Sequence, residues 1–163
     1  MTEFYAQPYS ASHTGFYFDS QEKYEAGMER LEEQGGEEVE IQLIDGDDAQ
    51  YRIAESASIS QIDIDMWFYQ LEDLDDREAD QLCYLLDCGY NLEDALEKYN
   101  EVQIWEGSAE DYVYDLLNET TDMSSMGWLQ NYIDYESIAR DMRLNSEIAE
   151  IRHGVWVTNA SEF

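Results

Sequence analysis

The sequence predicts an α+β fold in the form of an elongated chain of three small domains. The expected domains are a mixed α/β domain over residues 1–58, a helical bundle over 59–101 and a second mixed α/β domain over 102–163. Two observations lead to this prediction. The spacing of apolar residues changes twice, from mixed to purely helical and back again. The joints near 57–60 and 100–103 are too short for flexible linkers, so we expect small modules docked in a line.

The first predicted domain combines strands with one helix. Aromatic residues within 3–18 predict strands, and a stripe of apolar residues at helical spacing predicts a helix over 20–34. Strict alternation over 39–43 predicts a half-buried strand. The Asp-Gly pair that follows is a strong turn signal and predicts a hairpin whose return strand covers Tyr51–Ile53.

The middle domain is expected to contain three short helices. Ser60 can cap the first, and Asp75 can cap the second, which Gly89 would end. Asn91 can begin the third, with Asp94 three residues later, where a carboxylate can bond back to the cap.

The third domain returns to a mixed pattern. A strand is expected over 102–105, and Ser108 followed by Asp111 predicts the start of a helix that reaches about Asn118. One or two helices are expected over 126–143, and a closing strand over Val155–Thr158.

The charge of the chain limits its partners. It has 39 Asp and Glu against 8 Lys and Arg, a formal net charge of −31, and the acids are spread over all three domains. Direct binding to nucleic-acid phosphates or to an anionic membrane requires clustered bases and is therefore not expected. Disorder is also not expected, because the chain is 44% hydrophobic and 13% aromatic.

Other features concern location and redox state. No apolar run is long enough to span a membrane, and the first ten residues do not resemble a signal peptide, so we expect a cytoplasmic protein. Cys83 and Cys88 lie five residues apart on a predicted helix, which disfavours a disulfide or a shared metal. We expect two buried free thiols and no cofactor or metal.

Four roles for the acids compete. Calcium binding is disfavoured because Arg77 stands where an EF-hand loop starting at Asp73 needs an oxygen ligand. Catalysis by paired carboxylates is disfavoured because no recognised catalytic motif is present, so we expect no enzyme. General solubility remains an alternative.

The fourth role is imitation of DNA. Duplex DNA carries one charge per roughly 1.7 Å of axis, so 31 charges correspond to about 15 base pairs. A folded scaffold with fixed carboxylates could occupy a basic groove that holds DNA mainly through phosphate contacts. The scarcity of bases in 61–103 favours this role, because an exposed helix normally pairs its acids with bases. The predicted acidic surface consists of Asp63, Asp65, Glu72, Asp73, Asp75, Asp76, Glu78, Asp80, Asp87, Glu93, Asp94, Glu97, Glu101, Glu110, Asp111, Asp115 and Glu119.

One run of sequence resembles a known family. Residues 129–141 read LQNYIDYESIARD, which resembles the LQNYIDYxxxARD signature of the ArdA antirestriction proteins encoded on plasmids, transposons and phages. The resemblance extends over essentially the whole chain. Similar stretches are Tyr5–Ser10, Gly15–Phe18, Ile41–Asp47, Trp67–Phe68, Gly89–Tyr90 and Asp94–Tyr99.

The resemblance implies a fold and a function. ArdA proteins are curved rods of three small domains that dimerise through the third domain and imitate bent DNA. They bind the methyltransferase core of type I restriction–modification enzymes, made of specificity and modification subunits, without catalysis or cofactor. Alternative targets are another DNA-binding defence or nucleoid protein. An acidic protein with no partner at a DNA site is a further alternative.

The residues of the signature are expected to divide between packing and binding. The motif and dimer region comprises Leu129, Asn131, Tyr132, Ile133, Asp134, Tyr135, Glu136, Arg140 and Asp141. Tyr132, Ile133 and Tyr135, with Ile138, have amphipathic spacing and are expected in the core or the dimer interface. Asp134, Glu136 and Asp141 are candidates for facing the target.

Two details of this region involve single residues. Arg140 is expected to form a structural ion pair with Asp134 or Asp141. Asn145 is expected to adopt the left-handed backbone conformation where many family members have glycine.

Overall fold

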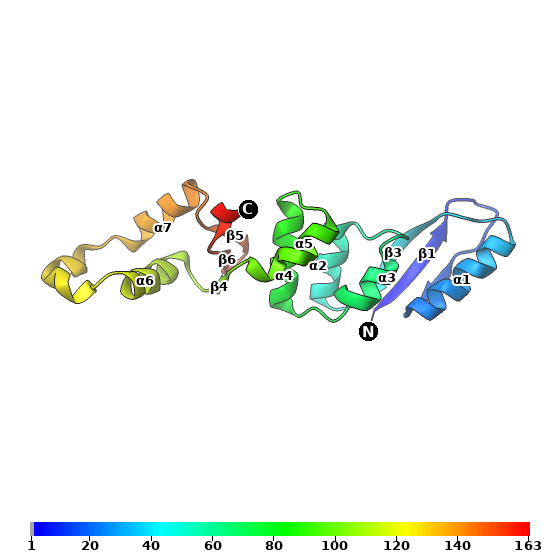
Figure 1. Cartoon of the computed structure of the whole chain (residues 1–163), viewed down its shortest axis with the longest axis horizontal. Helices are drawn as coiled ribbons and strands as arrows, with labels where there is room; N and C mark the ends of the chain where they lie inside the picture. The colour runs from blue at the N-terminus through cyan, green and yellow to red at the C-terminus, as the bar shows by residue number, and fades with distance from the viewer. Residues whose placement is uncertain (1) are drawn as a thin grey trace. The chain divides into compact units, whose positions relative to one another are not determined.

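The computed structural model describes residues 2–163 and combines α-helices with two small antiparallel sheets (Figure 1). This confirms the predicted α+β class. The chain divides into two compact units, the first ending at Leu96 and the second covering Glu97–Phe163. The first unit contains the predicted first domain and most of the predicted middle domain. The division into three domains, and their arrangement in a line, stay predictions.

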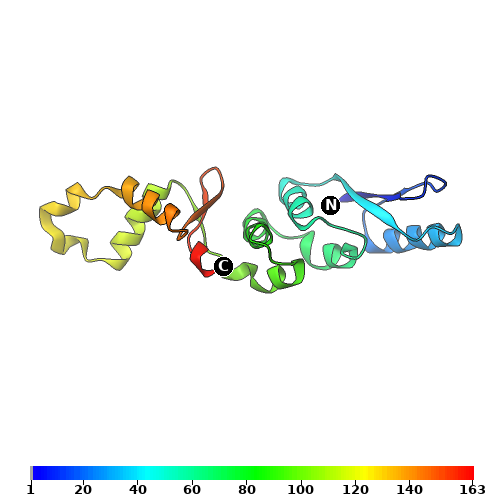
Figure 2. The same ribbon diagram turned by 90° about the horizontal axis from the view of Figure 1, so that it is seen from above.

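The first unit begins with a three-stranded sheet of order β2-β1-β3. Figures 1 and 2 show α1 running beside this sheet. Its elements are β1 (Glu3–Pro8), β2 (Phe16–Phe18), α1 (Gln21–Glu33), β3 (Val39–Asp45), α2 (Asp48–Ala57), α3 (Ile64–Met66), a π-helical turn (Trp67–Leu71), α4 (Asp76–Asp87) and most of α5 (Leu92–Lys98), within which the unit ends. The strands and the helix predicted before residue 45 are therefore confirmed.

Aromatic rings fill the core beneath the sheet. Phe4 of β1 stacks on Phe18 of β2 with ring centroids 5.4 Å apart, and meets the edge of Trp67 at 5.0 Å. Trp67 is fully buried, and its indole N–H donates to the hydroxyl of Thr2 over 3.2 Å. Gly27 lets α1 approach the sheet, because a Cβ atom at this position would lie 2.1 Å from the ring of Phe16.

The segment after β3 differs from the prediction. Residues 51–53, predicted as a return strand, lie in the helix α2. Asp47 caps this helix: its carboxylate accepts from the main-chain N–H of Gln50, and the Gln50 side chain accepts from the N–H of Asp47. This reciprocal capping box fixes a helix start directly after the Asp-Gly pair, so the pair leads into a helix instead of a hairpin.

The start of the middle segment also differs. Ser60 does not cap a helix; its N–H and hydroxyl both donate to the carboxylate of Asp63, the residue that precedes α3. The helix that begins at Ile64 then widens into the π-helical turn Trp67–Leu71.

The next two helices agree with the prediction. Asp75 caps α4, Gly89 follows its end with a positive φ of 96°, and Asn91 accepts a hydrogen bond from the N–H of Asp94 at the start of α5. The thiols are free as expected, but Cys88 is exposed and Cys83 is only half-buried. The expectation of two buried thiols is wrong because Cys88 follows the last residue of α4 and faces solvent.

The second unit is built on a sheet of order β4-β6-β5. Its elements are β4 (Ile104–Glu106), α6 (Ala109–Thr120), a 3₁₀ segment (Met123–Tyr132), α7 (Tyr135–Leu144), β5 (Ala149–Arg152), β6 (Val155–Val157) and two short 3₁₀ turns (Tyr99–Glu101 and Ala160–Glu162). The predicted strands, the helix capped by Ser108 and the helix within 126–143 are confirmed, whereas β5 was not predicted. Its four residues, AEIR, alternate between half-buried apolar and exposed charged side chains, but this alternation is too short to identify a strand from the sequence.

The turn after α7 corrects one detail. Asn145 has a right-handed φ of −87°, and the left-handed conformation falls on the next residue, Ser146, with a φ of 59°. The N–H of Ser146 bonds to the carbonyl of Arg143, so the turn closes one residue later than expected.

Candidate functional site

Most of the predicted acidic surface is exposed. The exposed members are Asp65, Asp73, Asp75, Asp76, Asp87, Glu93, Asp94, Glu97, Glu101, Glu110, Asp111, Asp115 and Glu119. Asp63, Glu72 and Glu78 are half-buried. Asp80 is buried, with 5% of its surface accessible, and is the only buried acidic residue within 2–163. Its inclusion in a contact surface was wrong, because it lies between two packed helices.

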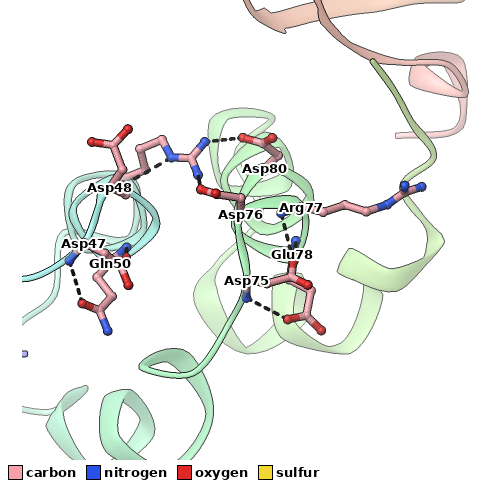
Figure 3. Close-up of polar contacts among 9 residues, drawn as sticks. Asp47, Asp48, Gln50, Asp75, Asp76, Arg77, Glu78 and Asp80 are labelled. Atoms are coloured by element: carbon pink, nitrogen blue, oxygen red, sulfur yellow. Dashed lines mark hydrogen bonds and ion pairs between the residues drawn. The ribbon is translucent and has the colours of Figure 1, made fainter. Parts of the chain in front are cut away.

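A group of carboxylates gathers where α2 and α4 pack together (Figure 3). We call it the α2–α4 acidic cluster, and it consists of Asp47, Asp48, Asp75, Asp76, Glu78 and Asp80. Most of its members lie at the N-terminal ends of the two helices, where the helix dipole and the free main-chain N–H groups stabilise negative charge. Their positions are therefore set by the backbone.

A second capping box fixes the acids of α4. One carboxylate oxygen of Asp75 accepts from the N–H groups of Arg77 and Glu78, each at 2.9 Å. The carboxylate of Glu78 in turn accepts from the N–H of Asp75 at 2.9 Å. Because both carboxylates are tied to the main chain, they lose the freedom that an exposed acidic side chain normally keeps.

Arg52 of α2 is the cation of this cluster. Its guanidinium contacts Asp76 at 2.8 Å and Asp80 at 2.5 Å, both on α4. Asp76 remains exposed despite this contact, whereas Asp80 is enclosed. Figure 3 shows the side chain of Arg77 extending away from these carboxylates. Arg52 thus joins the two helices, and most of the cluster's charge still faces solvent.

Two of the half-buried acids have structural contacts. Glu72 accepts from the N–H and the hydroxyl of Thr2, at 3.0 and 2.6 Å, and so holds the start of β1. Asp63 accepts from Ser60, as described above. Asp65, in contrast, is exposed, and its charge adds to burial in raising the pKa of Tyr24.

The acids of α5 and α6 are exposed along both helices. Asp94 and Asp111 lie in first turns: Asn91 donates to the carboxylate of Asp94 at 2.6 Å, and Ser108 donates to that of Asp111 at 2.7 Å. The remaining members of the predicted surface on or beside these helices, Glu93, Glu97, Glu101, Glu110, Asp115 and Glu119, are exposed.

In the signature region, Asp134 acts as a helix cap. Its carboxylate accepts from the N–H and the hydroxyl of Ser137, at 3.0 and 2.8 Å, at the start of α7. These bonds, helped by the charge of Arg140, lower its pKa. Arg140 pairs with Asp141 at 3.6 Å, but both side chains are about two-thirds exposed, so this pair adds little stability.

Two apolar residues of the signature are exposed in the single chain, and their packing in a dimer interface stays a prediction. Tyr132 is 76% exposed and Leu129 is 49% exposed, so neither is in the core of the single chain. Trp128, 69% exposed, contacts Tyr132 edge to face at 5.7 Å. We call Trp128, Leu129 and Tyr132 the 3₁₀ apolar patch. Of the rest, Ile133 and Tyr135 are half-buried, and Asn131, Glu136 and Asp141 are exposed.

Comparison with protein families identifies the chain. The model of the antirestriction protein ArdA matches residues 10–157, which is most of the sequence. The chain belongs to the ArdA antirestriction family. No curated protein and no solved structure gave a match. The resemblance first indicated by residues 129–141 is therefore confirmed, and with it the role of an antirestriction protein.

The structure of this ArdA-family chain adds residues that the sequence did not indicate. Asp47 and Asp48 belong to the α2–α4 acidic cluster, and Arg52 pairs with it, but none of the three was identified because their segment was predicted to form a hairpin. The spacing of Asp47 and Gln50, which matches a capping box, was the available signal. Within residues 2–163, no helix has the length and apolar character needed to cross a membrane, and no three His, Cys, Asp or Glu side chains are placed so that they could hold a metal ion together.

Proposed function

We propose that this ArdA-family chain inhibits type I restriction–modification enzymes as a DNA mimic. In this proposal, its carboxylates take the place of phosphates in the DNA-binding groove of the methyltransferase core, formed by the specificity and modification subunits. The chain acts stoichiometrically in the bacterial cytoplasm, with no cofactor and no catalysis.

The observation that supports this mechanism best is the way the carboxylates are held. In the α2–α4 acidic cluster, Asp47, Asp75 and Glu78 are bonded to main-chain N–H groups of their own helices. A phosphate on DNA is fixed by its backbone, and a groove that recognises phosphates selects for charges held at set positions. Acids that only improved solubility would need no such fixation.

The charge balance supports the same mechanism. The family assignment covers residues 10–157, and the acids of that range are largely unaccompanied by bases, since the whole chain has 8 Lys and Arg for 39 Asp and Glu. Repulsion between these acids opposes folding, so a requirement of function explains their retention.

A homodimer is part of the proposal. The 3₁₀ apolar patch exposes a tryptophan, a leucine and a tyrosine in a chain that is otherwise strongly charged. Exposed aromatic residues of this kind favour an interface between proteins. The signature residues beside the patch would then lie in or near the contact between two copies, which doubles the length of acidic surface.

A competition experiment tests the mechanism. A labelled duplex bound to a type I methyltransferase is titrated with the protein, and displacement is followed by fluorescence anisotropy. We expect complete displacement at a fixed stoichiometry, and a weaker interaction as salt rises from about 50 to 200 mM. If duplex and protein bind the enzyme together, the mimicry is wrong. Capture of a different DNA-binding protein from host lysate would redirect the proposal to that target.

A further inference from the structure

The strand β3 has one unpaired edge. It pairs with β1 alone and ends the sheet of order β2-β1-β3. The N–H of Tyr9 donates to the carbonyl of Glu38, so Glu38 and every second residue after it direct their main-chain groups toward β1. Val39, Ile41 and Leu43 therefore direct theirs toward the free edge. The bond from the N–H of Val39 to the side chain of Gln61, at 2.9 Å, agrees with this alternation.

The free edge has main-chain groups available for binding. At Val39 the main-chain N–H is already bonded to the side chain of Gln61. In the part of the chain that the structure describes, no hydrogen bond engages the N–H and C=O groups that Ile41 and Leu43 direct to this edge. Open edges of this kind are usually blunted by charged side chains, especially lysine, by proline, by a bulge or by a covering element. β3 contains no lysine or proline; its charged residue within the groove is Glu40, and its register against β1 shifts only after Leu43.

A groove runs beside this edge. Its volume is about 390 Å³, and it lies between β3, the C-terminal half of α2 and the residues that follow α2. Val39 and Ile59 are buried and Ile41 is half-buried, which gives the groove an apolar side. Glu40 and Glu55 are exposed and lie among its lining residues, and Tyr9, 70% exposed, lies at its border.

The charges around the groove select for a cationic occupant. No lysine or arginine lines it, and the last turn of α2, whose dipole is negative at this end, contains no base. A second copy of β3 is a poor occupant, because it would bring Glu38 and Glu40 of the other chain against the same acids. An extended segment with basic side chains is attracted instead, and Tyr9 can contact its cations through the ring.

We propose that the groove between β3 and α2 binds an extended segment of a protein partner by strand addition. The segment alternates apolar and basic residues: the apolar ones lie over Val39 and Ile41, and the basic ones lie beside Glu40. Its main chain pairs with Ile41 and Leu43. This binding differs from the mimicry proposed above, because it uses main-chain hydrogen bonds and not carboxylates in place of phosphates.

Amide exchange on the full chain tests the proposal. The probe is an acetylated and amidated hexapeptide that alternates lysine and valine, and the exchange of main-chain N–H groups is followed by NMR. At saturating peptide, we expect the amides of Ile41 and Leu43 to exchange at least about tenfold more slowly, because pairing with a strand protects main-chain N–H groups. The amides of Phe16 and Phe18, in the opposite edge strand, serve as the internal control and should not change.

Matched probes and variants separate strand addition from simple attraction of charge. The same hexapeptide, N-methylated at alternate residues, keeps its charges but cannot pair, and should give no protection. The variants Glu40→Gln and Glu55→Gln, both at exposed positions, should each weaken peptide binding by about two- to fivefold. Asp19→Asn, at a position away from the groove lining, is the control variant and should bind normally.

Three results would overturn the proposal. The first is unchanged exchange at Ile41 and Leu43 with saturating peptide. The second is equal protection by the N-methylated peptide. The third is protection without peptide that rises with protein concentration, because it would mean that two copies pair through β3. Inhibition of a restriction enzyme is not part of this experiment, so failure here leaves the DNA mimicry to be judged by its own test.

Discussion

Arg52 and Asp80 form an ion pair across the interface of α2 and α4, with the Asp80 carboxylate enclosed and the guanidinium only partly accessible. In a chain of net charge −31, this pair places one of few bases against the one buried acid found within residues 2–163. The pair therefore holds α2 and α4 together against the repulsion between the acids at the starts of the two helices.

Removal of Arg52 should destabilise the fold. In Arg52→Met, Asp80 remains buried without its partner, and we expect a loss of about 3 kcal/mol in the free energy of unfolding, measured by urea denaturation. The double variant Arg52→Met/Asp80→Leu should recover most of this loss, because no buried charge remains. Lys23→Met, which breaks an exposed pair with Asp19, is the control and should cost less than about 1 kcal/mol. Equal losses in the two single variants would contradict the structural role of Arg52.

The cap at Asp75 allows charge and fold to be separated. Asparagine caps a helix nearly as well as aspartate, so Asp75→Asn should unfold at about the same urea concentration as the parent, while it removes one charge. Asp75→Ala removes both and should cost about 1 kcal/mol. If the proposed mimicry is right, the two variants should lose the same affinity for the methyltransferase in the DNA competition assay. A loss confined to Asp75→Ala would assign this residue a structural role alone.

The exposed acids of α5 and of the 3₁₀ turn that follows it should affect binding without affecting the fold. The combined variant Glu93→Gln/Glu97→Gln/Glu101→Gln removes three charges from exposed positions, so its stability should be unchanged or higher. We expect weaker displacement of DNA and a smaller dependence of binding on salt. A matched variant with three glutamines on α1, at Glu25, Glu29 and Glu32, shows whether the effect depends on position. Unchanged inhibition in both variants would favour an acidic protein with no partner at a DNA site.

The 3₁₀ apolar patch should control association between copies. Trp128→Ser and Tyr132→Ser replace side chains that are 69% and 76% exposed, so the single chain should remain folded. We expect sedimentation at micromolar concentration to change from dimer to monomer. Tyr69→Ser, at a residue 85% exposed in the first unit, is the control and should leave the association unchanged. A parent protein that sediments as a monomer would remove the dimer from the proposal.

The cap at Asp134 should contribute stability that depends on pH. Because its folded pKa lies below the ordinary value of 3.8, the contribution is present above pH 3.8 and is lost as pH falls through the folded pKa. In Ser137→Ala the hydroxyl bond to Asp134 is absent while the main-chain N–H bond remains, so an NMR titration of the Asp134 carboxyl should give a pKa that moves only part of the way toward 3.8. An unchanged titration would mean that the main-chain N–H of residue 137 and the charge of Arg140, and not the Ser137 hydroxyl, lower this pKa.

Local signals explain which parts of the fold were predictable. The caps at Asp75, Asn91 and Ser108 were identified because a helix start depends on residues three or four positions apart. The helix α2 was missed where two local signals competed, the Asp-Gly turn before it and the capping box of Asp47. Asp80 could not be distinguished from its neighbours, because its burial depends on α2, which lies 28 residues earlier in the chain at Arg52. Family membership, in contrast, followed from one contiguous run of sequence.

The capping of helices by acids also bears on how this surface can change. At an N-cap, aspartate, asparagine and serine serve the backbone almost equally well, but only aspartate is charged. Substitutions among these residues at Asp47, Asp75 or Asp134 can therefore add or remove charge and leave the helices in place. A protein built in this way can adjust its pattern of charge to a new target by single substitutions, without first having to find a new fold.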